Sequence, residues 1–363
     1  TRRARAGIMR PDGFREAPVA IVGGSGFIGS NLADSLLSDG VPVLVIDNLS
    51  RPGVDQNLAW LTQKHGNRLA VETVDVRDED VLAPLLAHAR AIFHLAAQTA
   101  VTTSLVRPSE DFDINLRGTF NVLEAARRSG RRIPVIFAST NKVYGGLPDV
   151  TVREEDDRCV PCDAGIGANG IDETCGLDFC TPYGCSKGAA DQYVLDYAKS
   201  YDLPTAVLRM SCIYGPRQFG TEDQGWVAHF LLSALSGRPI TIYGNGKQVR
   251  DILHVSDAVA AYRGVLARID DIGGQAFNLG GGPGNAVSLR MLLKEIGELT
   301  GRNLSIRYDR ERTGDQPFFV ADTRKIEATL GWKAHVSWRD GVRDLADWLQ
   351  RHRLEPEPAR YVA

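Results

Sequence analysis

The sequence lacks three features that would each point to a particular class of protein. It holds no uninterrupted run of about 18 apolar residues, so we expect no membrane span. Its 42 basic and 45 acidic residues nearly balance, and the net charge of −3 argues against nucleic acid as a partner. It has only six cysteines, and residues 1–18 carry five arginines without an apolar secretory core. We therefore expect a protein of the reducing cytoplasm.

The remaining composition is that of an ordinary globular protein, with 43% hydrophobic and 24% charged residues. A chain of 363 residues predicts two or three domains, or one large α/β unit with an appendage. We expect a disordered leader over 1–17, a dinucleotide-binding domain over 18–214, a substrate-binding lobe over 215–352 and a frayed tail over 353–363. Segments within about 252–280 are expected to return to the first domain.

Short apolar strands alternate with helical stretches through the first domain. Strands are predicted at Val19–Val22, Val43–Ile46, 69–74, 91–95, 133–138 and 206–208. Helices are predicted at Phe27–Ser38 and near 57–64, 79–89 and 110–129. This alternation predicts an α/β fold with a doubly wound parallel sheet of the Rossmann type, followed by a smaller C-terminal α/β substrate lobe. The connection over 145–181 shows little periodicity, and connections of that length are usually either functional or disordered.

A glycine-rich loop joins the first strand to the first helix. Gly23, Gly26 and Gly29 lie three residues apart, after a readable strand and before a readable helix. Such a turn lets the backbone approach a pyrophosphate at a helix N-terminus, although the same spacing can serve a purely structural turn. Asp47 ends the second strand, where a carboxylate accepts hydrogen bonds from ribose hydroxyls and repels a 2′-phosphate. The pattern favours NAD over NADP, a preference that the nearby Arg51 could soften.

Two further strand ends contribute to the same edge of the sheet. Asp75 and Val76 follow the third strand, where Asp75 can meet the adenine edge or can cap the next helix. The fourth strand ends in residues that are expected near the nicotinamide ribose, namely Leu95, Ala96, Ala97 and Gln98. Asn115, in the next helix, either anchors the lysine described below or is an ordinary polar helix residue.

A tyrosine and a lysine four residues apart open another helix. Thr181 is expected to cap this helix, with Pro182 in its first turn, so that Tyr183 and Lys187 share one face. The ammonium is expected to lower the phenol pKa from about 10, so that a tyrosinate can take a proton from a sugar hydroxyl while hydride leaves the carbon. The Tyr-x-x-x-Lys pattern is common by chance, and it gains weight here from the upstream glycine loop.

Other polar residues indicate how a substrate would be held. Thr140 follows a strand and is placed to hydrogen-bond the reacting oxygen, although it can also form a simple turn. Arg250 and Arg312 lie in polar, glycine-containing segments; a guanidinium suits a diphosphate, and a surface salt bridge is the usual alternative. The long connection also contains four cysteines, Cys159, Cys162, Cys175 and Cys180, which could in principle bind zinc. Their spacing favours free thiols and no bound metal instead.

Taken together, these stretches resemble the extended short-chain dehydrogenase/reductases, and within them the nucleotide-sugar epimerase branch. The resemblance covers about residues 18–350. It narrows to the CDP-tyvelose (CDP-paratose) 2-epimerase family over Ser139–Gly145, Asn169–Glu173, Tyr183–Tyr193, Gly215–Phe219, Asp223–Trp226 and Gly246–Asp251. The chain departs from many relatives at Cys212, where they carry asparagine, and in its cysteine-rich 145–181 segment.

The resemblance implies a redox-neutral, NAD-dependent epimerase that inverts C2 of a nucleotide-activated hexose, a CDP-hexose, through a transient ketone. It implies a homodimer or homotetramer, with Thr140, Tyr183 and Lys187 as the catalytic group. The implied cofactor-binding residues are Gly23, Gly26, Phe27, Ile28, Gly29, Asp47, Asn48, Ser50, Arg51, Asp75, Val76, Leu95, Ala96, Ala97, Gln98, Asn115, Tyr183, Lys187 and Met210. The implied substrate-binding residues are Thr99, Thr140, Asn141, Cys212, Arg217, Gln218, Gln224, Tyr243, Gln248, Arg250, Arg312 and Asp315.

A nucleotide-sugar 4-epimerase or a UDP-glucuronate decarboxylase-type enzyme on the same fold is the alternative. Asn141 and Lys142 stand where related dehydratases carry carboxylates, and decarboxylases usually carry glutamate in place of Lys142. Both differences count against those activities, whereas nothing local excludes a 4-epimerase. A non-enzymatic dinucleotide sensor ranks last, because it need not keep Thr140, Tyr183 and Lys187 together.

Overall fold

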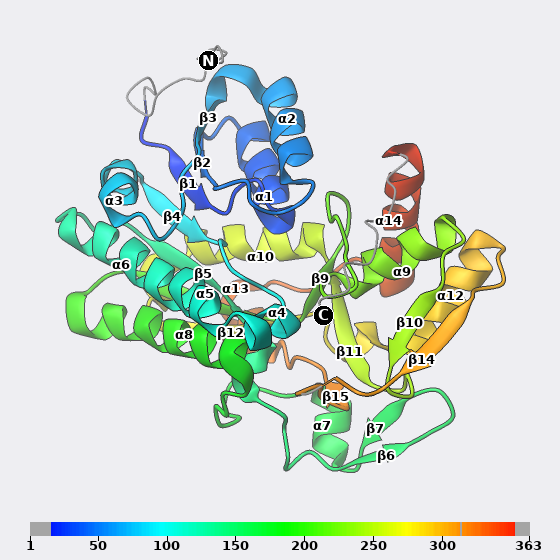
Figure 1. The fold of residues 1–363 in the computed structure, drawn as a ribbon. Helices are drawn as coiled ribbons and strands as arrows, with labels where there is room; N and C mark the ends of the chain where they lie inside the picture. Colours follow the sequence, from blue (N-terminus) through cyan, green and yellow to red (C-terminus); the bar gives the residue numbers. More distant parts are fainter. Residues whose placement is uncertain (1–15, 313, 353–363) are drawn as a thin grey trace.

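The computed structural model describes residues 16–312 and 314–352; most of the predicted leader and all of the predicted tail lie outside the described residues. Seven parallel strands form a central sheet in the order β12-β8-β5-β4-β1-β2-β3 (Figure 1). These are β1 (Val19–Val22), β2 (Val43–Ile46), β3 (Leu69–Glu72), β4 (Ala91–His94), β5 (Val135–Thr140), β8 (Thr205–Met210) and β12 (Gln275–Leu279). The strand order confirms the predicted doubly wound sheet.

Alternation along the strands explains why helices cover both faces of the sheet. Val19 and Ile21 point into one core, whereas Ala20 and Val22 point into the other. The first face is covered by α1 (Phe27–Ser38), α2 (Val54–His65), α10 (Val255–Ala267), α11 (Ile269–Ile272) and α13 (Arg324–Leu330). The second is covered by α3 (Glu79–Ala87), α6 (Gly118–Arg128) and α8 (Thr181–Tyr201). Burial on both faces accounts for the continuous apolar runs in the sequence.

The helix predicted over 110–129 is divided into three parts. α4 (Val101–Val106) precedes it, and then α5 (Pro108–Phe112), a π-helical turn (Asp113–Arg117) and α6 follow in direct succession. The turn brings Asp111 and Asn115 together toward α8, where both contact Ser186. A single turn of five residues is too short to show a period of its own, so periodicity does not reveal it.

The smaller lobe has its own core and lies beside the carboxyl ends of the central strands (right side of Figure 1). One mixed sheet contains β9 (Cys212–Tyr214), β11 (Val249–His254), β13 (Ala286–Ser288) and β15 (Phe318–Phe319). A second pairs β10 (Ile240–Tyr243) with β14 (Ile306–Asp309), and the lobe's helices are α9 (Trp226–Leu235), α12 (Leu289–Thr300) and α14 (Trp338–His352). Strand β12 and helix α10 pack in the larger core, as expected for 252–280, while the domain boundaries stay a prediction.

The 145–181 connection contains short elements of its own. After a single 3₁₀ turn (Asn141–Tyr144), β6 (Val152–Glu154) and β7 (Cys159–Pro161) form a hairpin that leads into α7 (Ala164–Asn169). The Cys159 N–H donates to the Lys247 carbonyl at 2.8 Å, which ties the hairpin to the loop before β11. Three-residue strands are too short to show a period, so the sequence could not reveal them. Within 16–352, residue 313 aside, no helix combines the length and apolarity needed to cross a bilayer.

Candidate active site

A cavity of about 830 Å³ lies between the carboxyl ends of the central strands and the smaller lobe. Ligands of open parallel sheets bind at this edge. Every residue predicted to bind cofactor or substrate lines the cavity, apart from Gln98 and Asn115. The predicted residues therefore share one space, and their local geometry decides what that space can hold.

The glycine loop forms a cradle with no room for side chains. A Cβ on Gly23 would lie 2.5 Å from the Ala96 nitrogen, and one on Gly29 would lie 2.3 Å from the Gly23 oxygen. Gly23 also has a φ of +84°, which glycine tolerates. No side chain caps α1 at Gly26, so backbone N–H groups of its first turn are available to a phosphate. These residues fit the pyrophosphate of a dinucleotide.

Asp47 lies directly beside this cradle. Its Oδ2 accepts a hydrogen bond from the Ser25 N–H at 3.0 Å, and its Oδ1 accepts one from the Leu49 N–H at 2.9 Å. Burial raises the pKa of Asp47, and the two N–H groups together with the charge of Arg51 oppose that rise. The carboxylate is thus fixed at the cavity edge, next to the glycine loop, as a ribose-binding role requires.

Asp75 is held by a different set of partners. Its carboxylate pairs with Arg77 at 2.8 Å and accepts a hydrogen bond from Asn48 at 2.9 Å. The Arg77 hydrogen bonds hold the pKa of Asp75 well below its usual range. Asp78, rather than Asp75, caps α3, so the capping alternative for Asp75 is wrong. Asp75 and Val76 instead line the cavity.

Gln98 and Asn115 lie behind the cavity wall rather than in it. The Asn115 amide accepts from the Gln98 N–H at 2.9 Å and donates to the Gln98 carbonyl at 3.0 Å. It also donates to Ser186 Oγ at 3.1 Å, one residue before Lys187. Both residues therefore brace the loop after β4 against α8, and Asn115 reaches the lysine through its chain neighbour.

Tyr183, Lys187 and Thr140 meet where α8 passes the end of β5. Tyr183 is 8% exposed and Lys187 is 3% exposed, and Tyr183 is hydrogen-bonded to Thr140. Helix α8 begins at Thr181, so Cys180 takes the cap position and the predicted Thr181 cap is displaced by one residue. Thr181 Oγ1 still accepts from the Gly184 N–H at 3.4 Å, which supports the first turn.

The acidities of this group differ from the sequence expectation. Burial raises the pKa of Tyr183 to about 12, against the Thr140 hydrogen bond and the charge of Arg51. Burial also lowers the pKa of Lys187 to about 7, against the charges of Asp191 and Asp111. The expected lowering of the phenol pKa by the ammonium is therefore wrong for the chain by itself. The buried lysine does not act on the phenol as a full positive charge, since its own environment favours the neutral amine.

Three predicted residues join the cofactor side of the cavity to the substrate side. Arg51 donates to Thr99 Oγ1 at 2.6 Å and also to the Gln224 side chain. Thr99 donates to the same Gln224 oxygen at 2.6 Å. Since Arg51 follows β2 and Gln224 precedes α9, this bridge spans the two lobes.

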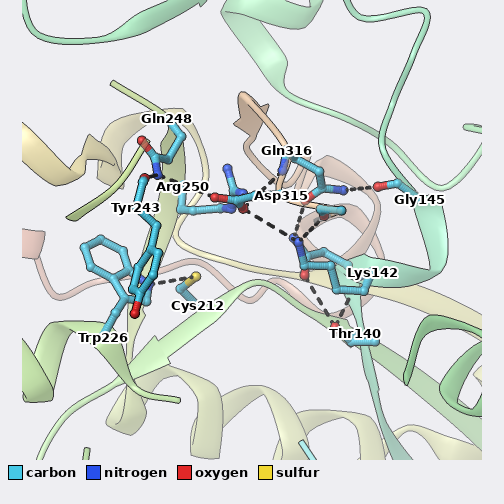
Figure 2. Close-up of polar contacts among 12 residues, drawn as sticks. Thr140, Lys142, Gly145, Cys212, Trp226, Tyr243, Gln248, Arg250, Asp315 and Gln316 are labelled. Atoms are coloured by element: carbon cyan, nitrogen blue, oxygen red, sulfur yellow. Dashed lines mark hydrogen bonds and ion pairs between the residues drawn. The ribbon is translucent and has the colours of Figure 1, made fainter. Parts of the chain in front are cut away.

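A polar wall faces the cavity from the smaller lobe, as Figure 2 shows. Arg250 is 7% exposed and donates to Asp315 at 2.5 Å, and Gln248 donates to the same carboxylate at 3.4 Å. Lys142 lies 3.8 Å from Asp315 and donates to the Gly314 carbonyl at 3.1 Å. Lys142 is absent from the predicted substrate residues, although it directly follows Asn141. The available signal is a lysine just after a buried strand.

Other predicted substrate residues are held more loosely. Arg312 stacks on the Tyr243 ring, 3.9 Å from its centroid, and pairs with Asp223 at 3.4 Å. Cys212 accepts from Trp226 Nε1 at 3.4 Å, and burial raises the pKa of its thiol. All six cysteines are free, and the described residues contain no group of three or more His, Cys, Asp or Glu side chains that could hold a metal ion.

Comparisons with known proteins extend this picture. A family model described as the NAD dependent epimerase/dehydratase family matches residues 19–280. The chain is 45% identical over 337 residues to the CDP-paratose 2-epimerase of Salmonella typhi, which covers 90% of this chain and 98% of that protein. These similarities confirm the resemblance to nucleotide-sugar epimerases that the motifs predict.

Two solved structures share the whole fold. The UDP-glucose 4-epimerase of Thermus thermophilus, in complex with NAD, is 30% identical with a TM-score of 0.76, covering 92% of this chain and 99% of that one. The UDP-glucose 4-epimerase of Thermotoga maritima, with UDP-glucose, is 29% identical with a TM-score of 0.78, covering 93% and 100%. The fold is thus shared over more than 90% of this chain.

Proposed function

Because the chain belongs to the NAD dependent epimerase/dehydratase family, we propose that it is a redox-neutral epimerase that inverts C2 of a CDP-activated hexose. The observation that carries this proposal is the meeting of Thr140, Tyr183 and Lys187 beside the glycine cradle, within one cavity. The assignment to C2 and to cytidine is supported by the 45% identity to a CDP-paratose 2-epimerase.

The catalytic roles follow from the hydrogen bonds at the phenol. Bound NAD supplies the hydride acceptor and, later, the hydride donor, and its positive charge favours a tyrosinate. Tyr183 takes the proton of the C2 hydroxyl and returns it to the oxygen when the second stereochemistry forms. Thr140, which is hydrogen-bonded to Tyr183, would hydrogen-bond the same oxygen, and Lys187, one helical turn along α8 from Tyr183, would buffer the proton. Oxidation is needed because C2 has no neighbouring carbonyl to make its C–H acidic.

Holding the dinucleotide falls to the first half of the chain. The cradle of Gly23, Gly26 and Gly29 would receive the pyrophosphate, and Asp47 would accept from the ribose hydroxyls. The Arg51, Thr99 and Gln224 bridge would keep the two lobes closed around it. Retention matters because each turnover returns the hydride that it borrows.

The second candidate is a nucleotide-sugar 4-epimerase. The similarity to two UDP-glucose 4-epimerases over more than 90% of this chain favours it. Both candidates use the same catalytic group and differ in which carbon of the ring reaches Tyr183.

An isotope experiment separates the two. CDP- and UDP-hexoses are incubated with the enzyme in deuterated water, and product stereochemistry and deuterium content are determined by NMR. Inversion at C2 without deuterium on carbon is the expected result. Inversion at C4, or loss of water or CO₂, replaces the proposal with the corresponding alternative.

We also propose a homodimer or homotetramer formed through α4, α5, α6 and α8. These helices carry a group of exposed apolar side chains, namely Leu105, Val106, Phe112, Phe120, Tyr193 and Tyr201. The rings of Phe120 and Tyr193 touch, with centroids 6.1 Å apart, which links α6 to α8 in one patch. Apolar patches of this kind commonly mark interfaces. Light scattering should give a dimer or tetramer mass, and Phe120→Asp should shift it to the monomer.

A further inference from the structure

Lys142, which the predicted substrate set omits, occupies a distinctive place in the cavity. The backbone N–H of Lys142 donates to Thr140 Oγ1 at 3.2 Å, so the backbone position of Lys142 is tied to the catalytic threonine. Its carbonyl lies 3.4 Å from where a Cβ on Gly184 would stand, beside the first turn of α8 that carries Tyr183. Its side chain lines the cavity on the way from Thr140 to Arg250 (Figure 2).

The charges around Lys142 leave a surplus of positive charge. Within the part of the chain that the structure describes, Lys142 and Arg250 share one carboxylate, that of Asp315. Despite burial, the charges of Arg250 and Lys142 hold the pKa of Asp315 below its usual value, so the carboxylate is ionised. The cluster of these three side chains therefore carries a net charge of plus one. Burial, helped by the charge of Arg250, lowers the pKa of Lys142 to about 8, and an anion beside the ammonium would stabilise its charged form.

The ammonium also has unused donor capacity. Among the described residues, which leave out 313, it makes one hydrogen bond, to the Gly314 carbonyl at 3.1 Å, and its contact with Asp315 is long at 3.8 Å. An ammonium has three N–H donors and accepts nothing, so it recognises oxygen acceptors and anions. A phosphate oxygen satisfies both requirements at once.

We propose that Lys142 binds the phosphate attached to the sugar and thereby brings C2, rather than C4, to Tyr183. The proposal rests on the proposed function and names the residue that sets its specificity. Three bonds separate C2 from the sugar-linked phosphorus, whereas five separate C4 from it. A C2 enzyme therefore needs its phosphate-binding cation close to the catalytic hydroxyls. Lys142 meets that condition because it lies two residues after Thr140. Arg250 lies further along the cavity wall, where it would bind the other phosphate of the diphosphate.

The test compares two nucleotides that differ only in the phosphate in question. Binding of CDP and of CMP is measured by calorimetry for the wild type and for Lys142→Met. The variant should lose at least about tenfold in affinity for CDP and less than about twofold for CMP, because only CDP carries the second phosphate. Equal losses for both nucleotides, or unchanged CDP binding, would overturn the proposal. Retained CMP binding and an unchanged melting temperature show that the variant is folded.

A second lysine serves as the matched control. Lys325 is partly buried and donates to the Ala276 carbonyl at 2.7 Å, but it does not line the cavity. Lys325→Met should bind CDP and CMP as the wild type does. If the wild type inverts C4, the proposed function and the placement of C2 fail together, while the CDP and CMP comparison still decides whether Lys142 holds the phosphate. If the wild-type enzyme prefers uridine nucleotides, UDP and UMP replace CDP and CMP in this comparison.

Discussion

The two halves of the cavity are built in different ways. On the cofactor side, backbone shape does the positioning: Gly23 and Gly29 leave no space for a Cβ, and backbone N–H groups hold Asp47. On the substrate side, the side chains of Lys142, Arg250 and Asp315 meet from segments far apart in the chain. The cofactor half is thus shaped by close-packed backbone, whereas the substrate half depends on the pairing of charged side chains from distant segments.

Tyr183 lies where the two halves meet, so its loss should have the largest effect. Tyr183→Phe removes the hydroxyl that moves the proton and keeps the ring. Turnover should fall by about 10³-fold while the purified protein still releases NAD on denaturation. Turnover and released dinucleotide are both measured. A variant that keeps more than a tenth of the wild-type rate would remove Tyr183 from its role.

A change in the backbone-built half should empty the cofactor site. In Gly29→Ala the new Cβ would lie 2.3 Å from the Gly23 oxygen, a backbone atom that cannot move aside cheaply. NAD content should drop by at least about tenfold, and the melting temperature should fall by several degrees. Gly167→Ala in α7 is the control, because apart from its chain neighbours and the backbone of its own helix no heavy atom lies within 4 Å of its added Cβ. Full NAD content in Gly29→Ala would show that the cradle is not needed.

A change in the side-chain-built half should leave the cofactor in place. Arg250→Met removes the buried guanidinium that pairs with Asp315. KM for the sugar nucleotide should rise by about tenfold or more, with NAD content unchanged. Arg339→Met, which alters an exposed side chain stacked on Trp338, should change neither quantity. Loss of NAD from the Arg250 variant would show that the substrate side also helps to hold the cofactor, contrary to this prediction.

A prediction about stability rather than activity concerns the buried Lys187, one helical turn after Tyr183 on α8. The pKa of Lys187 is lowered to about 7, whereas an unfolded lysine titrates near about 10.4. Between these values the unfolded chain binds one more proton than the folded chain, so raising the pH stabilises the fold. From pH 7 to 9, the wild type should gain up to about 1.4 kcal/mol per pH unit relative to Lys187→Met in urea denaturation. A difference that stays constant across this range would show that Lys187 keeps its charge.

The same division explains what could be predicted from the sequence. The order of β1, α1 and β2, the glycine loop and the Tyr183–Lys187 spacing are local patterns. The structure contains the three elements with the predicted bounds, and only the cap of α8 is shifted by one residue. The π turn at Asp113–Arg117, the hairpin of β6 and β7 and the role of Lys142 depend on contacts between distant segments. The acidity of Tyr183 was misjudged for a similar reason, because burial outweighs the neighbouring lysine.

The bridge of Arg51, Thr99 and Gln224 also bears on how a bound dinucleotide would be exchanged. A dinucleotide leaving past it would have to break the contacts of all three side chains together. One dinucleotide can then serve many sugars in succession, and the supply of fresh coenzyme does not limit the enzyme.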